Sequence, residues 1–167
     1  MTDSKRLTIL KALTAHLQGI TPANGYQHDL STAVHRGRVA FGNDTALPCV
    51  NILEPLNPDR EPRIADAVLV QKDDWVLLIQ GWVDDDESNP TDPAHLLMAD
   101  VKKRLALLMI DPLRDPNPAY MLGGKVANVF IEPGTVRPPD ENSARAYFYL
   151  RIVLSVVEHL DDPYRLD

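Results

Sequence analysis

The stretch 75–83, with the sequence Trp-Val-Leu-Leu-Ile-Gln-Gly-Trp-Val, decides the fold of this chain. It is nearly all apolar and contains β-branched and aromatic residues, which predicts a buried β-strand. The acidic segment 84–90 ends that strand, because it combines charge, turn-forming residues and a proline. The other elements are predicted outward from this strand.

A helix is expected directly after the acidic segment. Asp92 is predicted to be its N-cap and Pro93 its first residue, because the aspartate accepts hydrogen bonds from free amides and proline has no amide to leave unpaired. Apolar residues then recur at helical spacing, namely Leu97, Val101, Leu105, Leu108 and Met109. This stripe needs a sheet face to cover, and the preceding strand is the nearest.

The composition indicates an ordinary globular domain spanning residues 1–167. The 167 residues are 44% hydrophobic and 25% charged, which is typical of one folded domain. A formal net charge of −7 argues against nucleic acid as a specific partner. The single cysteine, Cys49, excludes an internal disulfide and, with no signal peptide in the sequence, indicates a reducing compartment. No apolar run approaches the roughly 20 residues of a membrane helix.

The charge is unevenly distributed along the chain. Residues 1–40 carry a net charge of +3 and the remainder −10. This distribution can be chance clustering on a solvated surface. It can also indicate two surfaces of opposite sign, which suit head-to-tail contacts between identical subunits.

The remaining elements are predicted from periodicity and from the 14 prolines, which interrupt helices and central strands. We expect a helix over 4–18, an edge strand near 31–38, a turn at 42–44 and a strand over 47–54. We expect strands at 64–70 and 75–83 to form an antiparallel hairpin through a tight turn at 72–74. A short strand is expected at 126–131 and proline-rich loops at 55–62, 111–118 and 132–143.

The last predicted strand, 145–159, has two different faces. Its even-numbered positions form an apolar row that should pack against helices: Ala146, Phe148, Leu150, Ile152, Leu154 and Val156. Tyr147, Tyr149 and Arg151 lie on the opposite, mixed face, which is suited to a partner. Residues 164–167 are expected to form a short tail.

The sequence contains no evident catalytic cluster. Cys49 lies inside a predicted strand, which favours a buried small hydrophobe over a nucleophile. No histidine pair has the spacing of a zinc site on a helix. A metal site built from His95 and the acidic residues 84–87 remains an alternative to a solvated acidic loop. Gly123-Gly124-Lys125 lacks the first glycine and the Ser or Thr of a phosphate loop.

The aromatic strand residues have two interpretations. Trp75, Trp82, Tyr147 and Tyr149 are core residues by default, since aromatic residues in strands usually are. Large rigid side chains also anchor subunit contacts, so the same residues suit an interface.

The order of the elements, together with three local stretches, resembles the tail terminator (tail completion) family of tailed bacteriophages. The stretches are Arg36-Gly37-Arg38-Val39, Leu47-Pro48-Cys49-Val50, and residues 75–83 followed by an acidic segment and a helix. The resemblance implies an α/β (α+β) sandwich: a mixed, largely antiparallel β-sheet with helices packed on one face, in a single domain.

The resemblance also implies a function. Such proteins form a ring, typically hexameric, that caps the tail tube, ends its polymerisation and joins it to the head-side connector. The expected partners are further copies of the chain, the tail tube protein and the head–tail connector protein. No membrane is expected, and nucleic acid would at most pass non-specifically through the ring. The expected location is the virion tail, assembled in the host cytoplasm. The family members are not enzymes, so no catalytic residue, metal or cofactor is expected.

The candidate interface residues are Arg36, Arg38, Asp84, Asp85, Asp86, Glu87, Tyr147, Tyr149 and Arg151. Two alternatives stay open from the sequence. One is another neck, connector or baseplate structural protein, and the other is a small metal-dependent hydrolase or ligand-binding protein.

Overall fold

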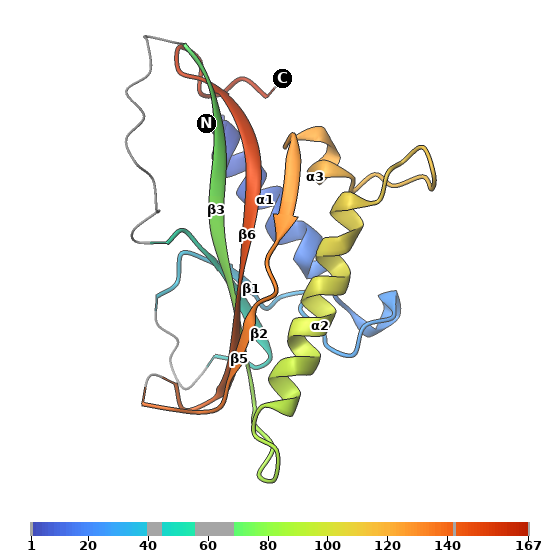
Figure 1. Ribbon diagram of the computed structural model, residues 1–167, viewed down its shortest axis with the longest axis vertical. Coiled ribbons are helices and arrows are strands. Elements are labelled where there is room, and N and C mark those ends of the chain that lie inside the picture. The colour runs from blue at the N-terminus through green and yellow to red at the C-terminus, as the bar shows by residue number, and fades with distance from the viewer. Residues whose placement is uncertain (1, 40–44, 56–68, 142, 167) are drawn as a thin grey trace.

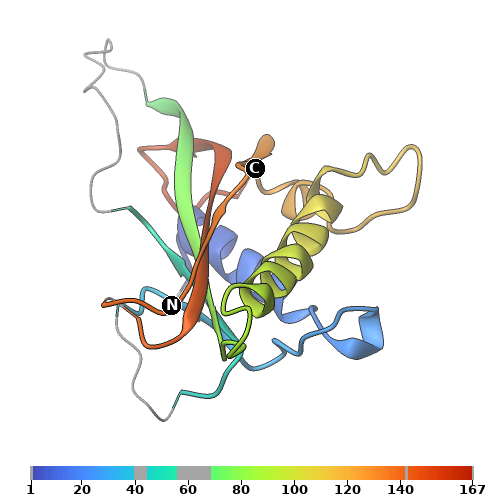
Figure 2. The same cartoon turned by 60° about the horizontal axis from the view of Figure 1, so that its bottom comes forward.

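The computed structural model describes residues 2–39, 45–55, 69–141 and 143–166. A six-stranded sheet forms one layer, and the helices form a second layer on one of its faces (Figures 1 and 2). All strand pairs are antiparallel except one, so the predicted fold class is confirmed. In the described part of the chain, no helix has the length and apolar content needed to cross a bilayer.

The helices and strands follow one another in a mixed order along the chain. They are α1 (Lys5–Gln18), η1 (Pro22–Asn24), β1 (Val34–Arg36), β2 (Cys49–Leu53), β3 (Val70–Val83), α2 (Asp92–Ala106), η2 (Leu107–Met109), α3 (Met121–Gly124), β4 (Asn128–Ile131), β5 (Thr135–Arg137) and β6 (Ala146–His159).

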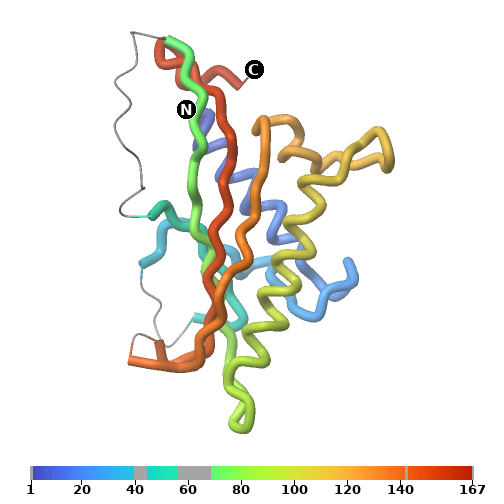
Figure 3. Tube along the Cα trace, viewed as in Figure 1, coloured from blue at the N-terminus to red at the C-terminus, as the bar shows by residue number. Residues whose placement is uncertain are grey.

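The sheet is built around one long strand pair. Its order is β1-β2-β3-β6-β4, with β5 also paired to β6, and only β1 and β2 run parallel. Strands β3 and β6 pair along their whole length, from Val70 opposite His159 to Val83 opposite Ala146 (Figure 3). The predicted edge strand near 31–38 is confirmed as β1, which pairs only with β2 among the described strands.

The core lies between the sheet and the two long helices. The predicted apolar row of β6 is confirmed, because all six of its even-numbered side chains from Ala146 to Val156 are fully buried. Helix α1 contributes Ile9, Leu13 and Leu17 to this core, and α2 contributes Leu97, Val101 and Leu105. Each large apolar side chain buried in this way stabilises the fold by about 1.5–3 kcal/mol.

A glycine makes room for Phe148, the largest fully buried side chain among the described residues. Gly81 in β3 lies directly opposite Phe148 in β6. A Cβ atom on Gly81 would lie 2.2 Å from Cε1 of Phe148, so the aromatic ring occupies the space of the missing side chain. The close approach explains a glycine inside a strand, where it normally weakens the pairing.

The predicted hairpin turn at 72–74 is wrong. Lys72, Asp73 and Asp74 belong to β3 and pair with β6. The two carboxylates are compatible with a strand because distant groups bind them: the Arg6 guanidinium of α1 forms an ion pair with Asp73 at 2.7 Å, and the Ser155 hydroxyl donates a hydrogen bond to Asp74 at 2.6 Å. The predicted strand at 64–70 falls largely outside the described residues, and the predicted turn at 42–44 lies entirely outside them.

Several element boundaries also differ from prediction. Thr91, not Asp92, precedes the first helical residue of α2. Met109 was predicted to belong to the apolar stripe of the helix, but its side chain is 43% exposed. The α-helix has ended before this residue, which lies in the 3₁₀ turn η2. The predicted loop 132–143 contains β5, which gains its hydrogen-bonding partner only from β6. The helix expected over 4–18 is confirmed as α1, and Ser4 caps it by accepting from the amide of Leu7.

Two groups of polar contacts fix α1 and the following loop against α2. The backbone carbonyl of Arg104 accepts from Nε2 of His16 at 2.7 Å, and Nε of Arg104 donates to the carbonyl of His16 at 2.7 Å. The buried carboxylate of Asp100 accepts from the amides of Gln27 and His28 and pairs with Nδ1 of His28. These contacts hold the ends of both helices at a fixed separation.

Replacing Gly81→Ala should destabilise the fold by about 1–3 kcal/mol, because the new methyl group overlaps the ring of Phe148. Urea unfolding of the wild type and the variant measures the difference. The double variant with Phe148→Leu should recover part of the loss, since the smaller side chain leaves room for the methyl group. A Gly81→Ala variant as stable as the wild type would contradict this packing.

Stability should decrease as the pH falls from about 6.5 to about 4. Burial lowers the pKa of His16 to about 4, from 6.5 for an exposed histidine, so the unfolded chain binds the proton more readily. The neutral, buried His16 contributes fully to the free energy of unfolding above pH 6.5. At low pH the loss of this contribution amounts to about 3 kcal/mol at most. Unfolding midpoints across this pH range should fall less steeply for His16→Gln, whose amide can donate to the same carbonyl without titrating. Equal slopes for both proteins would rule out His16 as the cause.

Candidate subunit interface

The face of the sheet opposite the helices carries partly exposed apolar side chains, and we call it the outer face. It is formed by the even positions of β3 and the odd positions of β6, together with Phe130 of β4 opposite Val153. In the described part of the chain both long helices lie on the other side (Figure 2). Phe130 is 59% exposed and Tyr149 is 38% exposed. This face can therefore contact another protein without any rearrangement of the core.

Three of the predicted interface residues lie on the outer face. The Tyr147 hydroxyl donates to Asp140 at 2.9 Å, and burial together with this bond raises the pKa of Tyr147. Nε of Arg151 lies 3.7 Å from a carboxylate oxygen of Glu132, an exposed pair that contributes little to stability. Tyr149 and Arg151 are therefore available to a partner, whereas Tyr147 is partly engaged within the chain.

The aromatic strand residues divide between core and surface. Trp75 is buried, with 3% of its surface exposed. Trp82 and Tyr147 are half-buried, and Tyr149 is exposed. The core interpretation is confirmed for Trp75 and wrong for Tyr149, because the two residues occupy opposite faces of the sheet.

The acidic loop lies at the end of β3, where β6 begins (Figure 1). Asp84 pairs with Arg145 at 2.6 Å, and the carboxylate of Asp86 accepts from the amides of Ser88 and Asn89. Asp85 and Glu87 are exposed. In the described residues no group of three or more His, Cys, Asp or Glu side chains is arranged to hold a metal ion, so His95 and this loop do not form a metal centre there.

Arg36 and Arg38 lie at the β1 edge of the sheet, apart from the acidic loop. The backbone amide of Arg38 donates to Oδ1 of Asn51, and Nδ2 of Asn51 donates to the Arg38 carbonyl. The side chains of both arginines are exposed. The nine predicted interface residues therefore fall in three separate places: the β1 edge, the acidic loop and the outer face.

Some of the basic side chains among the first 40 residues form ion pairs within the subunit. Arg6 binds Asp73 and Glu158 and lies 4.7 Å from the ring centre of Trp75. Lys11 pairs with Asp3 at 2.6 Å. These two cations hold α1 and its N-terminal end in place, so the excess positive charge of this segment does not form one continuous surface.

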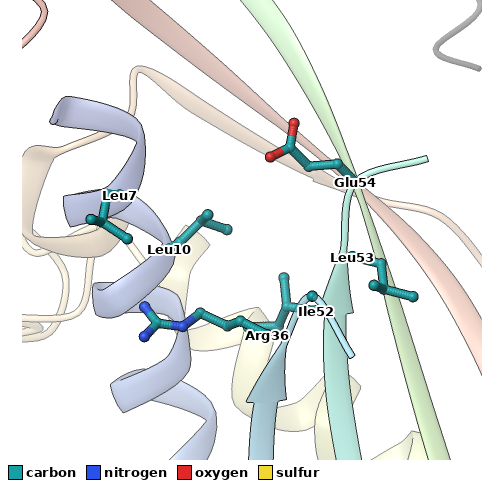
Figure 4. A pocket seen from close by; sticks show the side chains of 7 residues that line it. Leu7, Leu10, Arg36, Ile52, Leu53 and Glu54 are labelled. Carbon is teal, nitrogen blue, oxygen red and sulfur yellow. The ribbon is translucent and has the colours of Figure 1, made fainter. Parts of the chain in front are cut away.

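Sequence reasoning missed a groove between α1 and the edge of the sheet, which we call the α1–β2 groove. It has a volume of about 440 Å³ and is lined by Leu7, Leu10, Arg36, Gly37, Ile52, Leu53 and Glu54 (Figure 4). The carboxylate of Glu54 accepts from the indole nitrogen of Trp75 at 3.2 Å. Arg36 extends from β1 toward α1, and no ion-pair partner of its guanidinium is found among the described residues. No sequence signal could place these segments together, because they meet only after α1 packs on the sheet.

A smaller hollow of about 230 Å³ lies beside α3. The four residues of α3 all have positive φ, so this segment is a left-handed turn. Two glycines permit that conformation, and the burial of Leu122 stabilises it. Lys125 donates to the carbonyl of Leu122 and closes the turn. The hollow follows from this turn and contains no convergent set of reactive groups among the described residues.

Cys49 is fully buried, which confirms its interpretation as a small hydrophobe. Burial raises the pKa of its thiol to about 11.

Thiol reagents at pH 8 should therefore leave native Cys49 unmodified and label it quantitatively in urea, since the reactive species is the exposed thiolate. The variant Leu113→Cys with Cys49→Ala is a matched control, because Leu113 is 93% exposed and should react at once. Rapid labelling of native Cys49 would contradict the burial.

No protein-family model and no curated protein matches the chain. Function therefore has to be inferred from the residues and the fold.

Proposed function

We propose that this chain is a structural subunit of a bacteriophage tail, of the tail terminator type. Several copies form a ring that caps the tail tube, ends its polymerisation and joins it to the head-side connector. Its partners are then further copies of itself, the tail tube protein and the connector protein. It acts in the virion tail after assembly in the host cytoplasm, and it has no catalytic role.

The observation that carries this proposal is the one-sided sheet: no helix or strand of the described residues covers its outer face or extends its two edges. Strands β1 and β4 end the described sheet, and each pairs on one side only. Edge strands present free amides and carbonyls, which favour association with another chain. A ring of identical subunits needs two different surfaces on each copy, and the outer face and the α1–β2 groove are two such surfaces.

The element order supports the same proposal. The helix α1, the edge strand with Arg36-Gly37-Arg38, the strand β2, the long strand β3, the helix α2 and the final strand β6 follow one another as the resemblance requires. The sheet places Arg36 and the exposed outer-face residues Tyr149 and Arg151 on different surfaces, as a head-to-tail contact demands.

The assembly state tests this proposal. Light scattering over a wide concentration range, with electron microscopy of the same samples, should show closed rings. Addition of the tail tube protein from the same genome should give tubes with a ring at one end and should stop their elongation. A chain that stays monomeric and never associates with tubes would overturn the proposal. Rings that bind only the connector would assign the chain to the neck instead.

A further inference from the structure

We propose that the outer face of one copy packs against the outer face of a second copy, and that this symmetric dimer is the form of the chain before it assembles on a tail. The contact places β3, β4 and β6 over the same strands of the second copy, related by a two-fold axis. It goes beyond the proposed ring, because such a contact closes with two copies. A ring that uses the outer face forms only after the dimer separates.

The outer face has a row of three apolar side chains that runs across the strands. The register places Val76 of β3, Val153 of β6 and Phe130 of β4 side by side. Phe130 is 59% exposed, and the two valines are half-buried. Neighbouring apolar side chains on the open face of a sheet are typical of a face that packs against a second layer. A two-fold axis along this row places each of the three side chains against its own counterpart.

The polar groups on the two sides of this row are complementary. On one side lie Arg151 and Glu132, whose charged groups are 3.7 Å apart. On the other side lie Asp74 and Asn128, which are both in register with Ser155 of β6. The axis exchanges the two sides, so the first pair of one copy lies over the second pair of the other. Each copy therefore offers a cation to a carboxylate and a carboxylate to an amide, and both contacts occur twice.

Arg151 can reach Asp74 of the second copy. The axis places that aspartate over Leu78, which is in register with Arg151 on the neighbouring strand. Packed sheets lie about 10 Å apart and neighbouring strands about 4.8 Å apart, a separation that an extended arginine and an aspartate together span. A carboxylate accepts several hydrogen bonds, so the bond from the Ser155 hydroxyl to Oδ1 of Asp74 is compatible with this contact.

The size of the outer face predicts a weak, reversible dimer. Strands β3 and β6 have 14 residues each. The face is therefore about 46 Å long, and its three strands β3, β6 and β4 make it about 14 Å wide. This gives roughly 600 Å² per copy, close to the lower limit of specific interfaces, which bury about 1,200 Å² in total. A dimer of this size can separate when the chain assembles.

Two single variants of the full-length chain and their mixture test the pairing of Arg151 with Asp74. Arg151→Asp and Asp74→Arg each place like charges opposite one another, so each should dimerise at least about tenfold more weakly in sedimentation equilibrium. An equimolar mixture should recover dimers, because every contact then joins an aspartate to an arginine. Asp115→Arg, an exposed charge reversal in the loop between η2 and α3, is the matched control and should dimerise as the wild type does.

A cross-linking experiment tests the symmetry of the contact and does not depend on the charge variants remaining folded. Val153 lies on the axis, so a short bismaleimide should join the thiols of two Val153→Cys chains that also carry Cys49→Ala. Leu113→Cys in the same background is 93% exposed at the replaced position and should react with the reagent without giving covalent dimers. The cross-linked dimer should form no rings, because its outer faces stay covered.

The outcomes separate this inference from the proposed function. Rings that form without any cross-link at Val153, or a mixture of the charge variants that stays monomeric while both remain folded by circular dichroism, would overturn the dimer and leave the ring proposal in place. A cross-linked, charge-dependent dimer that never forms rings with the tail tube protein would support this inference and overturn the proposed function. A wild-type chain that stays monomeric would overturn the dimer.

Discussion

The structure depends on the pairing of β3 with β6. These two strands of 14 residues each are aligned over their whole length, and the register decides which side chains enter the core. Because side chains alternate with a period of two, a slip of one residue would move the apolar row of β6 to the outer face. The ring of Phe148 against Gly81 helps to fix the register, since the ring fills the space that a side chain at this position would need.

Polar contacts place the helices on this sheet, and their placement creates the candidate surfaces. Arg6 joins α1 to both long strands through Asp73 and Glu158. The His16–Arg104 contacts set the distance between α1 and α2. Helix α1 is thereby held beside β1 and β2, so the α1–β2 groove is a consequence of the same ion pairs that hold the subunit together. We expect assembly and subunit stability to be linked through α1.

Much of the fold was predictable because its signals are local. The alternation from Ala146 to Val156 predicted both the strand and its buried face. The helical spacing of Leu97, Val101 and Leu105 predicted the buried stripe of α2. Of the candidate site, the sequence identified the residue types that surround the sheet, including the exposed Tyr149 and Arg151. It did not reveal their distribution over three separate places, because that depends on which strands become neighbours.

By itself, the sequence determined the periodic elements, the burial of Cys49 and the two-sided character of the last strand, since each depends on residues close together in the chain. The tertiary structure alone decided that residues 72–74 are strand and not turn, because Arg6 pairs with Asp73 and Ser155 donates a hydrogen bond to Asp74 from far away in the sequence. It alone produced β5, which forms only against β6. It alone formed the groove, because Leu7, Arg36 and Ile52 become neighbours only when α1 packs on the sheet.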